Sequence, residues 1–269
     1  MLVVEYPDFL DAIRRESARF RAVLADCDPS ARVPGCPEWD AADLLWHLIG
    51  VQRFWAGVVQ HRPAGPDDER IVSEGSGERP ASYAELLAHF DEESAGLVEA
   101  LAAADPEEEA WHWSGDHRVG TTYRRQAHEA LIHRVDAEQA AGLALSPLDP
   151  ALAEDGVAEV IGVMFGGVPP WGTATPTGET VAVRTTDTGR ELLVAFRRFT
   201  GTDPDSGTTY DEDDLGLVDT GPEPSATVSG TAADLDLWLW KRGPADALEV
   251  EGDRISHEKL AGILAAPLN

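Results

Sequence analysis

The sequence predicts an α+β protein in two parts: a helical bundle followed by a smaller domain of strands and helices. Apolar residues recur at helical spacing through the first 165 residues. Alternation of apolar and polar residues, which is typical of strands, begins only after residue 180. A segment rich in glycine and proline, residues 166–172, separates the two patterns. We therefore predict a bundle over residues 1–165 and an α+β domain over residues 166–269.

Four long helices are expected in the first part. The first covers residues 7–25, and the second runs from a cap at Asp40 to about residue 59. The third starts at Ser82, which forms a capping box with Glu85. The fourth covers residues 121–141 and ends before Gly142. The polar segments 61–80 and 105–120 are predicted loops, and the first of them is long enough to act as a lid.

A fifth helix, residues 150–164, is expected to link the bundle to the second domain. There, residues 180–186 and 191–196 alternate in polarity on either side of a turn and predict a β-hairpin. Further strands are expected at 226–230 and 248–253, with helices at 231–240 and 256–265. The acidic segment 203–214 is predicted to be a solvated loop, because its carboxylates do not match the spacing of a calcium-binding loop.

The composition limits the kinds of partner. The chain of 269 residues carries 49 acidic and 21 basic residues, a net charge of −28, which argues against binding to nucleic acid or to anionic membranes. Cys27 and Cys36 match no zinc or redox spacing, and such sparing use of cysteine suits a reducing compartment. No segment resembles a signal peptide or a membrane span, so we expect a soluble, cytoplasmic protein, monomeric or homodimeric, that acts on a small molecule.

The most informative segment is QAHEALIHRVD, residues 126–136. Glu129 and His133 are four residues apart and would project from one face of a helix, where a carboxylate and an imidazole can hold one metal ion. The zincin pattern is excluded because His128 lies about 140° away from His133 around the helix. Asp136, one turn beyond His133, could orient its imidazole. The same residues could instead form a solvated face held by ion pairs between neighbouring turns.

A third ligand is available on the second helix. His47 lies within an otherwise apolar stripe, where a histidine can also be a core residue bonded to a carbonyl oxygen. If the second and fourth helices face each other, His47, Glu129 and His133 form a set of two imidazoles and one carboxylate. Such a set leaves coordination positions open for water or substrate.

Three segments resemble one protein family. Residues 35–51 (GCPEWDAADLLWHLIGV), 127–138 (AHEALIHRVDAE) and 229–243 (SGTAADLDLWLWKRG) are similar to the signatures of the mycothiol-dependent maleylpyruvate isomerase family, a group of DinB-like metalloenzymes. The resemblance implies a DinB-like four-helix bundle, a sterol-carrier-like second domain, and a divalent metal, usually zinc, bound by His47, Glu129 and His133. Mycothiol is an actinobacterial thiol, and the low lysine and high alanine content suits an actinobacterial chain.

The resemblance implies an isomerase or S-transferase that uses mycothiol as cosubstrate on a small electrophile. An anionic reactant would need local cations, and Arg125 and Arg242 are the candidate catalytic residues. Arg118 and Trp55 are the candidates for binding the cosubstrate. Two alternatives stay open: a metal-dependent hydrolase that activates water, and a non-catalytic module that binds a small ligand and keeps the metal for structure.

Overall fold

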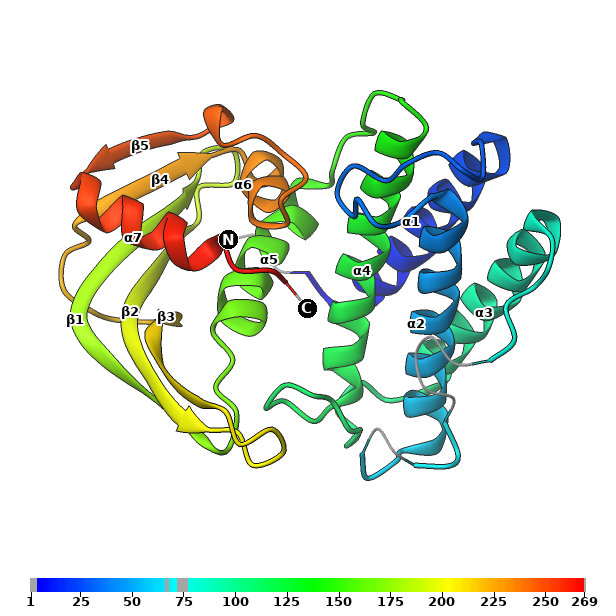
Figure 1. The fold of residues 1–269 in the computed structure, drawn as a ribbon, viewed down its shortest axis with the longest axis horizontal. Coiled ribbons are helices and arrows are strands. Elements are labelled where there is room, and N and C mark those ends of the chain that lie inside the picture. Colours follow the sequence, from blue (N-terminus) through cyan, green and yellow to red (C-terminus); the bar gives the residue numbers. More distant parts are fainter. Residues whose placement is uncertain (1–3, 66–67, 72–76, 269) are drawn as a thin grey trace. The chain divides into compact units, whose positions relative to one another are not determined.

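The computed structural model describes residues 4–65, 68–71 and 77–268. The chain divides into two compact units, Val4–Leu148 and Asp149 onward, and each is described by itself. The first is helical and the second contains a five-stranded sheet with helices, as Figure 1 shows, so the predicted α+β class is confirmed. Within the described part of the chain, no helix is long and apolar enough to cross a membrane. Residues 66–67 and 72–76 of the predicted lid lie outside the described residues.

Four helices of similar length form the N-terminal unit: α1 (Tyr6–Asp26), α2 (Ala41–His61), α3 (Tyr83–Ala103) and α4 (Val119–Ala140). The predicted caps are confirmed. Asp40 accepts a hydrogen bond from the backbone N–H of Asp43 (2.9 Å), and Ser82 and Glu85 bond each other's backbone as a capping box. After α4, Gly142 takes a positive φ of 66°, a conformation that glycine adopts without steric cost.

Apolar side chains on one face of each helix form the core of the bundle. The largest contacts are those of α1 with α4 and of α2 with α3, while α2 also packs against α4. Ile13, Phe20, Leu48, Leu101 and Val135 are fully buried. The α2–α4 contact is the one that matters for function, because it brings the His47 face of α2 onto the Glu129 face of α4.

A buried ionic network fastens α4 to α1. The guanidinium of Arg134, only 1% exposed, donates to Glu16 of α1 (2.8 Å) and to Glu138 one turn later (2.9 Å). Glu138 also accepts from Arg19 of α1 and from Ser146 beyond the helix. Burial alone would raise the pKa of Glu138, but these hydrogen bonds outweigh it and lower the pKa to about 2. The carboxylate is therefore ionised and fully paired at neutral pH.

Substitution of Glu138 should reveal a pH-dependent contribution to stability. The pKa of Glu138 is lower in the folded chain than in the unfolded one, so its stabilisation is present above about pH 4.3 and is lost as the pH falls towards 2. We expect Glu138→Gln to lower the free energy of unfolding by about 3 kcal/mol at pH 7, because it breaks a buried ion pair. Urea unfolding at pH 7 and pH 3 should show the deficit shrinking with acid. Glu99→Gln, on the exposed face of α3, is the control; an equal deficit at both pH values would contradict the network.

The C-terminal unit contains one mixed sheet in the order β3-β2-β1-β4-β5. Its strands are β1 (Gly172–Thr185), β2 (Glu191–Thr202), β3 (Thr209–Val218), β4 (Ala226–Gly230) and β5 (Glu249–Gly252). All neighbours are antiparallel except β1 and β4, which are parallel. The helices of this unit are α5 (Pro150–Glu159), α6 (Ala232–Leu239) and α7 (Arg254–Leu264). A π-helical turn, Val160–Phe165, extends α5.

The prediction of a solvated loop at residues 203–214 is wrong in its second half. Strand β3 begins at Thr209, and its carboxylates are balanced by arginines of the neighbouring β2. Arg197 pairs with Asp214 (2.7 Å), and Arg198 pairs with both Asp211 and Asp213. Cross-strand pairs of opposite charge stabilise a strand that local composition disfavours.

The division between the units also differs from the expected boundary after residue 165. It falls after Leu148, so α5 belongs with the C-terminal unit. The reason is close packing of α5 on α6: a Cβ atom at Gly156 would lie 2.6 Å from a carboxylate oxygen of Asp236. Only a glycine allows α5 to approach α6 so closely.

Candidate metal centre

Three side chains from α2 and α4 meet as the sequence predicts. One ligand atom each from His47, Glu129 and His133 can be chosen so that all three lie within 4.8 Å of one another. Oε1 of Glu129 is 3.1 Å from Nε2 of His133 and 3.5 Å from Nε2 of His47. One carboxylate oxygen thus faces two imidazole nitrogens, an arrangement that suits a single divalent ion. Among the described residues, this is the one group of three that could hold a metal.

The geometry follows from helical spacing. Glu129 and His133 are one turn apart on α4, so both side chains project from one face. His47 approaches from the facing helix, and its ring centroid lies 4.9 Å from that of His133. His128 packs edge-on against Phe9 of α1, with ring centroids 6.2 Å apart, which agrees with its exclusion from the ligand set.

Asp136 orients one of the imidazoles. Its carboxylate is fully buried and lies 3.0 Å from Nδ1 of His133. When Nδ1–H donates to Asp136, the lone pair of Nε2 points towards Glu129 and His47. A carboxylate behind a ligating imidazole is a common device for fixing its tautomer and direction.

The charge states are set by burial and by the neighbouring groups. Burial would lower the pKa of His133, but its hydrogen bonds with Asp136 and Glu129 outweigh burial and raise the pKa to about 9. Burial dominates at His47 and lowers its pKa, so this imidazole is neutral at pH 7. Burial would raise the pKa of Glu129, but Arg125 and the two imidazoles hold it well below its usual range. The site therefore presents an anionic oxygen and one neutral imidazole, while the second imidazole must release a proton to become a ligand.

Arg125 is the predicted catalytic residue that the structure places at the cluster. It is 8% exposed and forms an ion pair with Glu129 one turn later on α4. Arg242 belongs to the C-terminal unit, where its Nη1 donates to the carbonyl oxygen of Trp240 (2.7 Å).

The two residues predicted to bind the cosubstrate contact groups other than the three ligands. Arg118 is exposed at the start of α4 and pairs with Asp116 (2.7 Å) and Glu107 (3.0 Å). Trp55 is 4% exposed on α2; its ring stacks on Trp111 and lies 4.8 Å from that of His112. Their roles stay predictions.

One residue at the cluster was missed as an individual candidate. The ring of Trp39, just before the Asp40 cap, lies 4.6 Å from that of His47 and 6.4 Å from that of His133. A tight turn holds it there: the N–H of Trp39 donates to Cys36, and its carbonyl accepts from Val33. Its place in the first family signature is a signal that could have identified Trp39, but no helical spacing links it to the ligands.

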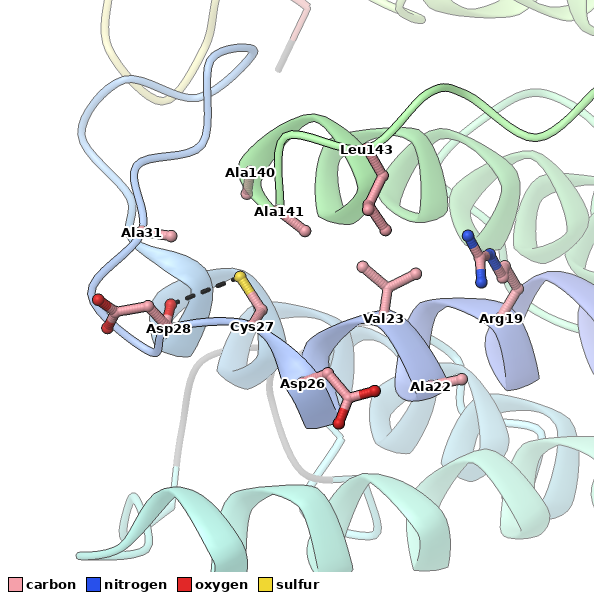
Figure 2. A pocket seen from close by; sticks show the side chains of 10 residues that line it. All are labelled: Arg19, Ala22, Val23, Asp26, Cys27, Asp28, Ala31, Ala140, Ala141 and Leu143. Carbon is pink, nitrogen blue, oxygen red and sulfur yellow. Dashed lines mark hydrogen bonds between the residues drawn. The ribbon is translucent and has the colours of Figure 1, made fainter.

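The cysteines do not contribute to the cluster. Both are in the thiol form. Cys27 lines a separate pocket between the C-terminal ends of α1 and α4, shown in Figure 2. Its Sγ donates to the carbonyl oxygen of Asp28 (3.5 Å), and burial raises the pKa of the thiol. Cys27 is thus protonated at neutral pH and a poor nucleophile.

Fold and site together define a two-part α+β protein with a candidate centre of two histidines and one glutamate. Residues 10–138 match the model of the mycothiol maleylpyruvate isomerase N-terminal domain, and residues 151–258 match that family's C-terminal domain. The chain belongs to the mycothiol-dependent maleylpyruvate isomerase family.

Two solved structures have a similar fold. The crystal structure of the mycothiol-dependent maleylpyruvate isomerase is 16% identical in sequence and matches with a TM-score of 0.59. The match covers 93% of this chain and 94% of the chain in that structure. A variant of it in which one histidine is alanine matches at 15% identity with the same coverage and TM-score. No match was found among curated proteins. At this identity the structures support the fold, and the chemistry has to be argued from the site.

Removal of His47 should abolish metal binding. We expect the wild-type chain to retain about one divalent ion after dialysis. His47→Ala should retain almost none, because one carboxylate and one imidazole remain. His89→Ala is the matched control, since His89 on α3 has the same exposed side-chain fraction as His47, 30%. Elemental analysis reads the metal content, and full retention by His47→Ala would contradict the assignment.

Loss of the carboxylate behind His133 should weaken metal binding without abolishing it. Asp136→Asn keeps the shape but removes the charge that fixes the Nδ1–H tautomer. We expect a fall in zinc affinity of about 10- to 100-fold. Competition with a chromophoric chelator measures it, and unchanged affinity would show that Asp136 has only a structural role.

Proposed function

We propose that this chain is a metal-dependent enzyme that uses mycothiol as cosubstrate on a small electrophile. The observation that carries the proposal is the donor set: His47, Glu129 and His133 converge, and three protein ligands leave positions open for a reactant. A divalent ion held there, with zinc as the expected metal, would supply Lewis acidity that lowers the pKa of a thiol bound beside it. Family membership supports the choice of thiol.

The residues around the ligands have separate tasks in this proposal. Asp136 holds the His133 tautomer, and Trp39 forms an aromatic wall beside both imidazoles. Arg125 balances the charge of Glu129 and is the proposed donor to a carboxylate of the electrophile. A local cation is needed because the chain carries a net charge of −28. Arg242, Arg118 and Trp55 remain proposed contacts of the reactants.

The electrophile is proposed to be a small unsaturated diacid of the maleylpyruvate type. Addition of the thiol sulfur to a carbon of the cis double bond makes that bond single, so it can rotate. Loss of the thiol then restores the double bond as trans. If the adduct leaves before the thiol is expelled, the product is a mycothiol S-conjugate. The relatives named as maleylpyruvate isomerases support the first outcome.

The test is a thiol-dependence assay on zinc-loaded protein. We expect maleylpyruvate to isomerise, or a mycothiol conjugate of an electrophile in a screened panel to appear by mass spectrometry, with mycothiol and not without it. Hydrolysis of a panel compound without thiol would favour the hydrolase alternative. No turnover with any compound would contradict an enzymatic role.

Substitution of Arg125 in the zinc-loaded protein, where a bound ion would also balance the charge of Glu129, should affect the reaction more than the fold. Arg125→Met removes the proposed carboxylate contact, and we expect kcat/KM for a diacid to fall about 100-fold. The matched control is Arg21→Met on α1, where Arg21 pairs with Asp91 at the surface. Steady-state kinetics measure kcat/KM for both variants, and circular dichroism verifies that both are folded. Equal activity of the two variants would contradict the proposed contact between Arg125 and the substrate carboxylate.

A further inference from the structure

Next to the proposed metal ligands, α4 carries a buried amide whose hydrogen-bonding groups are unsatisfied. Gln126 is 1% exposed, and among the described residues neither its Oε1 nor its Nε2 has a hydrogen-bond partner. Thr122, one turn earlier and fully buried, likewise has an Oγ1 with no partner in the part of the chain that the structure describes. Buried polar groups in folded proteins are nearly always paired, because an unpaired one loses its bonds to water without replacement.

The position of Gln126 relates it to the ligands. It precedes Glu129 by three residues and His133 by seven, so at 100° per residue it lies within about 20° of His133 around the helix. Its Cα is about 4.5 Å along the helix axis from that of Glu129. The flexible side chain of glutamine can cover that distance, so its amide can reach a group attached to an atom bound at the cluster.

The chemistry of the amide indicates what it would bind. Its oxygen accepts and its nitrogen donates, so together they match one secondary amide, which offers an N–H and a carbonyl oxygen. An arginine or lysine would select an anion, and an apolar side chain would select a hydrocarbon. Gln126 therefore favours a neutral, amide-bearing ligand over a carboxylate.

We propose that Gln126 is a specificity-determining residue that hydrogen-bonds an amide adjacent to the sulfur of the thiol cosubstrate. The inference rests on the proposed function and deepens it, since it names the residue that would distinguish an amide-bearing thiol from a simple alkyl thiol. A cysteinyl thiol carries its amide groups within a few bonds of sulfur, which is the reach that the spacing of Gln126 and Glu129 requires. A thiol bound in this way would supply the hydrogen-bond partners that the Gln126 amide lacks among the described residues.

Replacement of a ligand-binding amide should have a different effect on stability from replacement of an amide with a structural role. Gln126→Met keeps the volume but removes the unsatisfied amide, so we expect the thermal midpoint to rise by a few degrees while affinity for an amide-bearing thiol falls at least tenfold. The matched control is Gln52→Met on α2. Gln52 is also buried and its Oε1 is likewise without a partner among the described residues, but its Nε2 donates to Ser17 (3.0 Å), so this variant should lose that hydrogen bond, gain no stability and keep thiol affinity.

The experiment is calorimetric titration of zinc-loaded wild type and both variants with N-acetylcysteine methylamide and with 2-mercaptoethanol, beside thermal unfolding without thiol. We expect the Gln126→Met defect with the first thiol only. Three results would overturn the inference alone. The first is an equal affinity of wild type and Gln126→Met for the amide-bearing thiol, and the second is an equal loss of affinity of Gln126→Met for both thiols. The third is a thermal midpoint of Gln126→Met below that of wild type. A wild-type protein that binds neither thiol would overturn the proposed function and the inference with it.

Discussion

The candidate centre depends on the neutralisation of one carboxylate inside a helical bundle. Glu129 is 12% exposed, and its charge is shared by Arg125 on the same helix and by the imidazoles of His133 and His47. An ionised carboxylate in such surroundings is tolerated only when it is paired and hydrogen-bonded. Because one of the partners comes from α2, the same requirement fixes how α2 and α4 face each other. The charge balance of the site and the packing of α2 against α4 therefore depend on each other.

The rest of the N-terminal unit keeps α4 in place. Arg134 follows His133 directly and lies about 100° further round α4, where it joins Glu16 and Glu138 in a buried network with α1. Two ionic systems on different faces of α4 thus set its rotation, one towards α1 and one towards α2. The site is built on long helices rather than loops, which favours a fixed ligand geometry.

Local patterns predicted most of this arrangement. The caps at Asp40 and Ser82, the Gly142 terminus and the spacing of Glu129 and His133 are all properties of short sequence windows. His47 could be linked to them because a lone imidazole on an apolar stripe needs an explanation. The features that were missed depend on contacts distant in sequence: β3 needs arginines from β2, and the place of α5 needs the fit of Gly156 against Asp236. The position of Trp39 beside the imidazoles depends on a turn that no periodicity reveals.

The most direct measurement of the central claim is X-ray absorption of the zinc-loaded chain with and without mycothiol. The open three-ligand site predicts two imidazole nitrogens and a carboxylate oxygen around zinc, with one sulfur neighbour at about 2.3 Å appearing when mycothiol is added. A zinc shell already closed by a fourth protein ligand, or one that gains no sulfur with saturating thiol, would contradict the claim.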